Sequence, residues 1–202
     1  MATVSTSADL LGARADRVRY LDVPRLRFFM VEGSGAPGAE TMEPRIALLY
    51  PVAYGLHFAL RERGVRGRVA PLEGLWWTAD GRPLEAQQAE RAAWRWTLML
   101  AVPAEATEDD IATVIEDVRR KKPGLPLGDL RVEWFAEGPS AQILHVGPYE
   151  AEGPTIERLL AAIAADGFRP RGRHHEIYLG NPRRARPDRL RTILRQPVEP
   201  AV

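Results

Sequence analysis

Short segments of the chain are either apolar throughout or alternate between apolar and polar residues, and both patterns predict β-strands. The segments are residues 27–31, 69–78 and 94–102 in the first half and 132–136, 141–146, 174–179 and 190–194 in the second. Glycine, proline and small polar residues separate them, as expected for turns and loops. The pattern therefore predicts many short strands, several of them joined as hairpins.

Apolar residues recur at helical spacing in other segments, which predicts helices over residues 46–63, 107–122 and 155–165. Thr107 with Asp110 three positions later is a capping-box pattern, which predicts where the second helix begins. Pro51 lies inside the first helix, so we expect a kink or a break near Tyr50. The turn EGPS is expected to separate the strands 132–136 and 141–146.

The order strand, helix, strand, strand occurs twice, which favours an α+β fold with antiparallel sheets over a parallel doubly wound sheet. The first repeat covers about residues 25–103, a linking helix about 107–122, and the second repeat about 130–198. We expect residues 1–17 to be a flexible N-terminal segment and residues 18–202 to form a single domain. Two such repeats packed together predict a central ligand groove.

The composition narrows the possible functions. The 202 residues include 28 basic and 27 acidic side chains, a formal charge of +1, which gives no reason to expect binding to nucleic acid or to a membrane. The absence of cysteine excludes disulfides and thiolate metal sites and fits a reducing cytoplasm. No apolar run approaches the roughly 18 residues expected of a membrane-spanning helix.

The stretch HHEIYL, residues 174–179, contains the most informative carboxylate. Alternation places His174, Glu176 and Tyr178 on one face of the strand and His175 on the other. Glu176 either faces solvent or lines a cleft, where burial would raise its pKa toward that of a working base. The residues alone leave both alternatives open. The two histidines point to opposite faces and cannot readily share an ion, so we expect no metal.

Aromatic residues form a second group of candidates. Trp76, Trp77 and Trp96 lie in two of the expected strands, and they serve either as core or as the wall of a flat pocket. Tyr149 follows Gly147-Pro148 at the end of a strand, where it either packs with its hydroxyl in solvent or donates a proton to a ligand oxygen.

Six ordered segments carry a family resemblance: LYPVAYGLHFALRERG, PLEGLWW, WRWTLML, QILHVGPYEAEGPTIERL, GRHHEIYLGNPRR and LRTILRQPV. Over roughly residues 18–198 the chain resembles the stand-alone branch of the GyrI-like small-molecule-binding proteins. The resemblance implies a GyrI-like, SOUL-like fold whose central groove binds hydrophobic and often cationic drugs. It also implies that Glu176 reaches into the groove and that Tyr149 matches the tyrosine of the family's GPY motif. The ligand-binding residues that we expect are Trp76, Trp77, Trp96, Tyr178, Glu73 and Tyr54.

The chain is similar, within that family, to hydrolases that open the cyclopropane of DNA-alkylating natural products and so confer resistance. The resemblance implies Glu176 as the base and Tyr149 as the proton donor, with Glu73 or Tyr178 as alternatives, and neither metal nor cofactor. The partner would be a hydrophobic aromatic small molecule. The alternatives are a non-catalytic protein that binds or sequesters drugs, with Glu176 as counter-ion to a cation, and a protein that interacts with gyrase.

Overall fold

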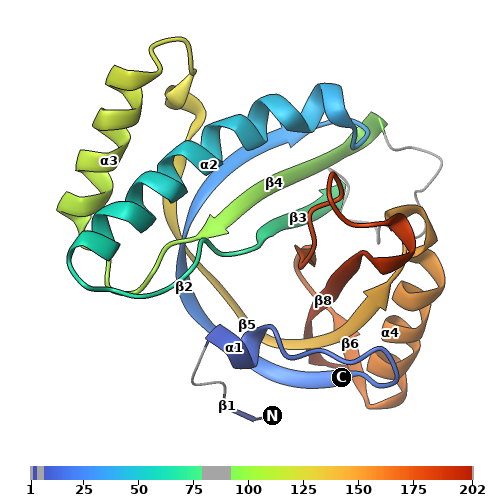
Figure 1. Ribbon diagram of the computed structural model, residues 1–202. Coiled ribbons are helices and arrows are strands. Elements are labelled where there is room, and N and C mark those ends of the chain that lie inside the picture. Colours follow the sequence, from blue (N-terminus) through green and yellow to red (C-terminus); the bar gives the residue numbers. More distant parts are fainter. Residues whose placement is uncertain (1, 4–6, 79–91, 202) are drawn as a thin grey trace. The chain divides into compact units, whose positions relative to one another are not determined.

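The computed structural model describes residues 2–3, 7–78 and 92–201 (Figure 1). These residues form two compact units. Unit 1 comprises Met1–Arg25, Glu73–Ala89 and Ala136–Val202, and unit 2 comprises Leu26–Leu72 and Glu90–Phe135. Three strands cross from one unit to the other: β2 (Arg19–Ser34), β3 (Leu72–Thr78) and β5 (Arg131–Val146).

Unit 1 contains an antiparallel sheet in which β3, β7, β8 and β5 follow one another. In this sheet β7 comprises His174–Tyr178 and β8 comprises Arg191–Pro200. The other elements of unit 1 are β1 (Ala2–Thr3), α1 (Ser7–Leu10), η3 (Tyr149–Ala151), α4 (Gly153–Ala165), β6 (Phe168–Pro170) and η4 (Pro187–Arg189). The register of β7 and β8 pairs Glu176 with Leu194 and Tyr178 with Thr192. The side chains of Glu176 and Tyr178 therefore share a face with alternate residues of β8.

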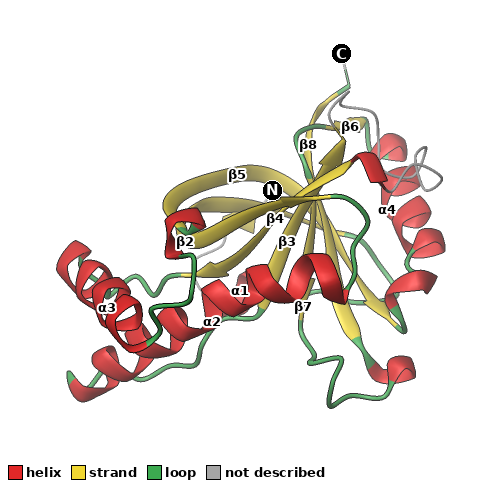
Figure 2. Ribbon diagram, turned by 90° about the horizontal axis from the view of Figure 1, so that it is seen from above, coloured by secondary structure: helices red, strands yellow, loops and turns green. Residues whose placement is uncertain are grey.

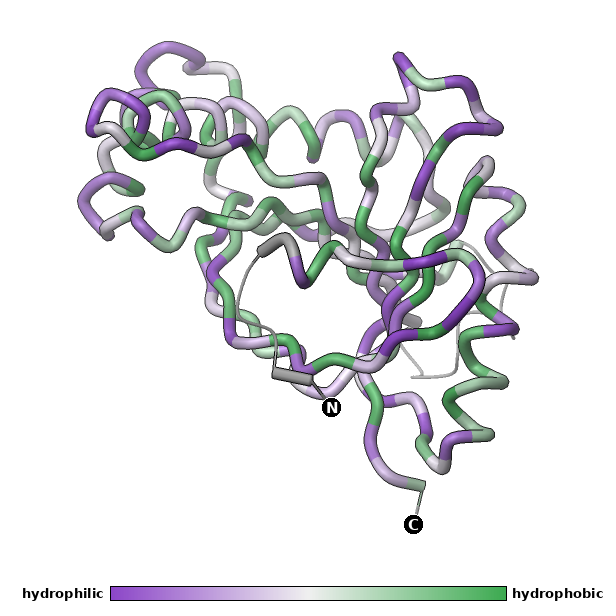
Figure 3. Tube along the Cα trace, turned by 60° about the horizontal axis from the view of Figure 1, so that its bottom comes forward, coloured by the Kyte–Doolittle hydropathy of each residue, from purple (hydrophilic) through white to green (hydrophobic). Residues whose placement is uncertain are grey.

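Apolar side chains cover both faces of this sheet. On one face, α4 packs Leu159 and Ile163 against Ile143 and Leu194 (Figures 1 and 2). Figure 3 shows both hydrophobic and hydrophilic positions along α4, and its buried residues Leu159 and Ile163 lie on one side of the helix. On the other face Leu144, Ile177 and Ile193 form a second cluster. Burying each such side chain contributes about 1.5 to 3 kcal/mol, which holds β7 and β8 in place.

Unit 2 contains two helices and an antiparallel strand pair. Its elements are α2 (Ala39–Glu62), β4 (Trp94–Ala101), α3 (Glu108–Lys121) and η2 (Leu127–Asp129), with parts of β2 and β5. The strands β2 and β4 pair with Met30 opposite Met99. A Cβ atom at Gly55 of α2 would lie 2.9 Å from Val114 of α3, so the glycine permits the close approach of the two helices.

The predicted order of elements is confirmed, because β2–α2–β3–β4 is followed by β5–α4–β7–β8 with β6 as a short addition. The capping box is confirmed as well. The Asp110 amide donates to Thr107 Oγ1 at 3.1 Å, and the Thr107 amide donates to Asp110 Oδ2 at 2.9 Å. The described part of the chain has no helix with the length and apolar character needed to cross a membrane.

Two local expectations were wrong. The expected break at Pro51 is absent, because α2 continues through it, whereas a kink near Tyr50 stays a prediction. A proline removes one backbone donor, and the buried face formed by Leu48, Val52 and Leu56 outweighs that loss. The segment EGPS is not a turn, because β5 runs unbroken from Arg131 to Val146. Gly138 adopts a positive φ of 71°, which changes the local direction of the strand without reversing the chain.

Candidate functional site

Titratable side chains gather on both faces of β7, and all of those described next belong to unit 1. Glu176 and Tyr178 point to one face, and His175 points to the other, where it contacts Glu73 and Glu137. This confirms the alternation expected from HHEIYL. We call Glu176 and its neighbour Glu152 the carboxyl pair, and Glu73, His175, Glu137 and Arg195 the ionic network.

Glu176 is held in place by aromatic residues. The Tyr178 hydroxyl donates a hydrogen bond of 2.7 Å to Glu176 Oε2. The Trp76 indole Nε1 donates to the Tyr178 oxygen at 3.2 Å, which orients that hydroxyl. The Glu176 side chain keeps 15% of its surface exposed, so water or a ligand atom is able to reach it.

The ionisation of Glu176 is displaced toward neutral pH. Burial raises its pKa to about 7, although the hydrogen bond from Tyr178 and the positive charge of His175 oppose the rise. His174 supplies no charge on this face, since burial and the charge of His175 lower its pKa to about 4. A carboxylate with a pKa near the working pH is suited to act as a general base.

Tyr149 stands beside this carboxylate with a free hydroxyl. Its ring lies edge to face against Tyr178, with the centroids 5.6 Å apart. Among the described residues its hydroxyl has no hydrogen-bond partner. Burial, and then the charges of Glu152 and Glu176, raise the pKa of Tyr149 to about 12, so the group keeps its proton. Tyr149 is therefore a proton donor available to a ligand.

His145 fixes the turn that carries Tyr149. Its Nε2 lies 3.2 Å from the Pro148 carbonyl oxygen and its Nδ1 lies 3.0 Å from Thr155 Oγ1. A carbonyl oxygen only accepts, so Nε2 donates to Pro148, and the second hydrogen bond joins Nδ1 to the threonine hydroxyl. The imidazole thus ties the segment before Tyr149 to the first turn of α4.

Glu152 is the member of the site that the sequence did not single out. It is the residue before α4, it is 5% exposed, and it makes no side-chain capping hydrogen bond. Its Oε1 is buried without a hydrogen-bond partner among the described residues. Burial, and then the negative charge of Glu176, raise the pKa of Glu152 well above its ordinary value. The only signal in the sequence was its position three residues after Tyr149.

In the ionic network on the opposite face, unlike the carboxyl pair, the carboxylates contact cationic side chains. His175 Nδ1 lies 2.9 Å from Glu137 Oε1, and His175 Nε2 lies 2.9 Å from Glu73 Oε2. Arg195 donates to Glu137 Oε2 at 3.0 Å and to the Leu10 carbonyl oxygen at 2.8 Å. Burial alone would raise the pKa of Glu137, but His175 and Arg195 lower it to about 2. Burial alone would lower the pKa of His175, but Glu137 and Glu73 raise it to about 9.

The other predicted site residues lie in different surroundings. Glu73 belongs to the ionic network and not to the face of Glu176. Trp77 lies four residues after Glu73 in β3 and therefore on the same face of the strand. The Arg173 guanidinium stacks on its ring, 3.8 Å from the ring centre. Trp96 belongs to unit 2, where it is buried and its indole donates to the Gly35 carbonyl oxygen at 3.3 Å.

Tyr54, the remaining candidate, is exposed on α2 in unit 2. Its ring stacks between Tyr50 and Phe58, at centroid distances of 6.0 and 6.3 Å. The ligand-binding roles of Tyr54 and Trp96 stay predictions.

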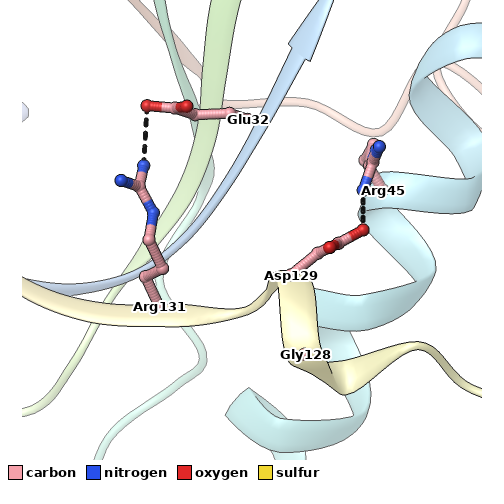
Figure 4. Close-up of a pocket in the computed structure, with 5 residues that line it drawn as sticks. All are labelled: Glu32, Arg45, Gly128, Asp129 and Arg131. Carbon is pink, nitrogen blue, oxygen red and sulfur yellow. Dashed lines mark hydrogen bonds and ion pairs between the residues drawn. The ribbon is translucent and has the colours of Figure 1, made fainter.

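A separate pocket of about 360 Å³ lies in unit 2 (Figure 4). It is lined by Glu32, Arg45, Gly128, Asp129 and Arg131. Two ion pairs, Arg131 with Glu32 and Arg45 with Asp129, neutralise its four charged side chains. None of the predicted site residues lines it, so we place the candidate site at the carboxyl pair.

Solved structures resemble the chain over nearly its whole length. An uncharacterized conserved protein from Listeria innocua is 34% identical, with a TM-score of 0.82 and coverage of 93% of this chain and 94% of that one. Two structures described as hydrolases from Listeria innocua are 30% and 31% identical, with TM-scores of 0.78 and 0.79. They cover 95% and 94% of this chain and 96% and 95% of their own. No curated protein sequence matches the chain.

A family model gives the more general result. The model of the GyrI-like small molecule binding domain matches residues 17–199. That match includes both strand-helix-strand-strand repeats, the linking helix and every residue of the carboxyl pair and the ionic network. The chain therefore belongs to the GyrI-like family of small-molecule-binding domains.

Proposed function

We propose that this protein is a cofactor-independent hydrolase that opens the electrophilic cyclopropane of flat, DNA-alkylating aromatic compounds and so gives resistance to them. The observation that carries the proposal is the Glu176 carboxylate, which is oriented by Tyr178, partly exposed, and has a pKa raised to about 7. Its two solved relatives described as hydrolases support an enzymatic role.

The proposed reaction needs one base and one donor. In such substrates the cyclopropane is conjugated to a dienone. Glu176 takes a proton from water while the water oxygen bonds to a ring carbon and the strained carbon–carbon bond breaks. The electron pair of that bond moves to the carbonyl oxygen, which becomes a phenol when it receives a proton.

Tyr149 is suited to supply that proton or to stabilise the developing oxyanion, because its own hydroxyl is uncommitted. The Tyr178 hydroxyl already donates to Glu176, which makes it the group that orients the base. Proton transfer by a positioned base is worth about a hundred to ten thousand fold in rate.

Turnover tests the proposal. Purified protein is incubated with a tenfold excess of a cyclopropanoid alkylating agent, and the water-added, ring-opened product is measured by mass spectrometry. We expect complete conversion by the wild type and loss of conversion in Glu176→Gln, with ligand binding retained. Consumption that stops at one equivalent per chain would contradict hydrolysis.

A drug-binding protein without catalysis is the second candidate. A carboxylate with Trp76, Tyr149 and Tyr178 close to it is suited to bind an aromatic cation by charge and by cation–π attraction. This candidate predicts tight binding of cationic dyes, weakened by Glu176→Gln, with no product formed from any cyclopropanoid.

A further inference from the structure

Glu152 and Glu137 are two carboxyl groups of unit 1 with similar burial and opposite surroundings. Glu137 is 2% exposed and contacts both Arg195 and His175. Glu152 is 5% exposed, and no lysine, arginine or histidine among the described residues forms an ion pair with it. A buried carboxylate is tolerated when it is paired, and an unpaired one stays protonated.

The groups that face Glu152 come from several elements, and none of them supplies a positive charge. Glu176 lies on β7 and Glu150 on η3, and both oppose its ionisation. The Thr192 hydroxyl on β8 favours the ionised form by hydrogen bonding, but burial and the two negative charges outweigh it. The carboxyl group of Glu152 in turn faces the hydroxyls of Tyr149 and Tyr178.

The start of α4 does not replace the missing cation. A helix N-terminus stabilises an anion through its free amide groups, but the Glu152 side chain makes no hydrogen bond to them. One of its oxygens, Oε1, is buried with no donor within reach in the described part of the chain. The geometry thus offers the ionised form of Glu152 neither an ion pair nor a cap.

We propose that Glu152 holds a proton at neutral pH and acts as a positioning residue for Glu176, so that the carboxyl pair carries one negative charge, located on the carboxylate that reaches solvent. Two adjacent carboxyl groups do not both ionise readily, because each negative charge opposes the other. The more buried Glu152 retains the proton, and the more exposed Glu176 loses its proton first.

This inference rests on the proposed function only for its effect on catalysis. In hydrolysis the single charge leaves Glu176 free to accept the proton of water, while Glu152 remains neutral throughout. In simple binding the same single charge favours a neutral or singly charged aromatic ligand over a dication.

Titration of the carboxyl groups tests the inference without any substrate. Protein labelled with ¹³C at the glutamate carboxyl carbon is titrated by NMR, and the Glu152 and Glu176 signals are assigned from Glu152→Gln and Glu176→Gln. We expect the Glu152 signal of the wild type to change above about pH 8, after that of Glu176. In Glu176→Gln it should move down by about one pH unit or more, because the opposing charge is gone. A Glu152 signal that is ionised by about pH 5 in the wild type overturns the proposal.

The pH dependence of turnover gives an independent readout. If Glu152 is neutral while Glu176 titrates, then Glu152→Gln replaces a neutral acid by a neutral amide and keeps the apparent pKa of the acid-side limb. The same change removes the second ionisation on the alkaline side. An acid-side limb that moves down by about one unit or more in Glu152→Gln overturns the proposal, since Glu152 would then be charged beside Glu176. Should no cyclopropanoid be turned over, the NMR titration alone decides, so a failed function and a failed inference are told apart.

Discussion

Buried glutamates lie against the two faces of β7, and although burial raises the pKa of both, their neighbours leave the two pKa values far apart. On one face Glu137 contacts Arg195 and His175, and their charges lower its pKa to about 2. On the other face the Tyr178 hydroxyl and the Trp76 indole are the nearby donors, and burial raises the pKa of Glu176 to about 7. His174 Nε2 lies 3.8 Å from Glu176 Oε1, but the pKa of that histidine is lowered to about 4, so it brings no positive charge at neutral pH. Neighbouring residues of one strand thus belong to a permanently charged structural network and to a site able to change its charge.

The difference shows that burial alone does not identify a functional carboxylate. The cost of burying an unpaired ion is several kcal/mol, and a helix N-terminus returns only about 0.3 to 1 kcal/mol of it. Cations of the protein meet that cost for Glu137. Among the residues that the structure describes, no cationic side chain forms an ion pair with Glu176 at neutral pH. A ligand that carries a positive charge, or a change of protonation, therefore alters the charge balance at Glu176. We expect function at the carboxyl pair and stability from the ionic network.

The largest effect should come from breaking the ionic network. In Glu137→Gln, Arg195 and His175 lose their buried counter-charge, so we expect the free energy of unfolding at pH 7 to fall by about 3 to 5 kcal/mol. Urea denaturation measures this free energy. Glu152→Gln is the matched control, because it replaces a carboxyl group that we propose to be neutral.

The same network should depend on acid. The folded-state pKa of Glu137, about 2, lies below its ordinary value of 4.5, so its stabilisation is present above pH 4.5 and is lost as the pH falls toward 2. The difference in free energy of unfolding between wild type and Glu137→Gln should therefore become smaller as the pH falls. A difference that stays constant from pH 7 to pH 3 would argue against an ionised Glu137.

Removal of the free hydroxyl is expected to have the next largest effect. Tyr149→Phe keeps the ring against Tyr178 and deletes the proton donor, so kcat should fall by about a hundred to a thousand fold with little change in KM. Steady-state kinetics on a cyclopropanoid checks this. A variant with full kcat would mean that another group, such as solvent, protonates the phenol.

Glu176→Gln should lose activity and gain stability at alkaline pH. The folded-state pKa of Glu176, about 7, lies above its ordinary value of 4.5, so its stabilisation is present below pH 4.5 and is lost as the pH rises through 7. The neutral amide avoids that loss, and we expect the variant to be about 1 to 3 kcal/mol more stable than wild type at pH 8. Thermal denaturation at pH 5 and pH 8 measures the difference, and a variant that is less stable at pH 8 would refute the buried-charge explanation.

The smallest predicted effect separates the two neighbouring tryptophans. Trp76→Phe removes the hydrogen bond to Tyr178, which is worth about 1 kcal/mol, so kcat/KM should fall a few-fold to about tenfold. Trp77→Phe is the matched control, because Trp77 stacks with Arg173 on the face of Glu73. An equal loss in both variants would support the sequence prediction that Trp77 also lines the site.

Local patterns in the sequence were enough to predict the order of the main helices and strands and the division of β7 into two faces. Alternation in HHEIYL separated Glu176 from His175, and the Thr107 capping box located the start of α3. Gly147-Pro148 at a strand end indicated Tyr149, and the family resemblance supported it. These features depend on residues a few positions apart.

Features that depend on distant residues could not be predicted in this way. Arg195 reaches Glu137 across 58 positions, and no local pattern indicates that pairing. Glu152 looked like one of several acidic residues before a helix, and only the fold shows that it is buried without a cation. The continuity of α2 through Pro51 likewise depends on the packing of its buried face.

The pH dependence of kcat/KM for the wild type on a cyclopropanoid tests most directly whether Glu176 works as an ionised base. We expect kcat/KM to be low below pH 6 and to rise through an apparent pKa of about 7 up to about pH 8, above which Glu152 ionises, and we expect Glu176→Gln to show no such rise. A profile that is flat between pH 5 and pH 8, or that falls as Glu176 ionises, would contradict it.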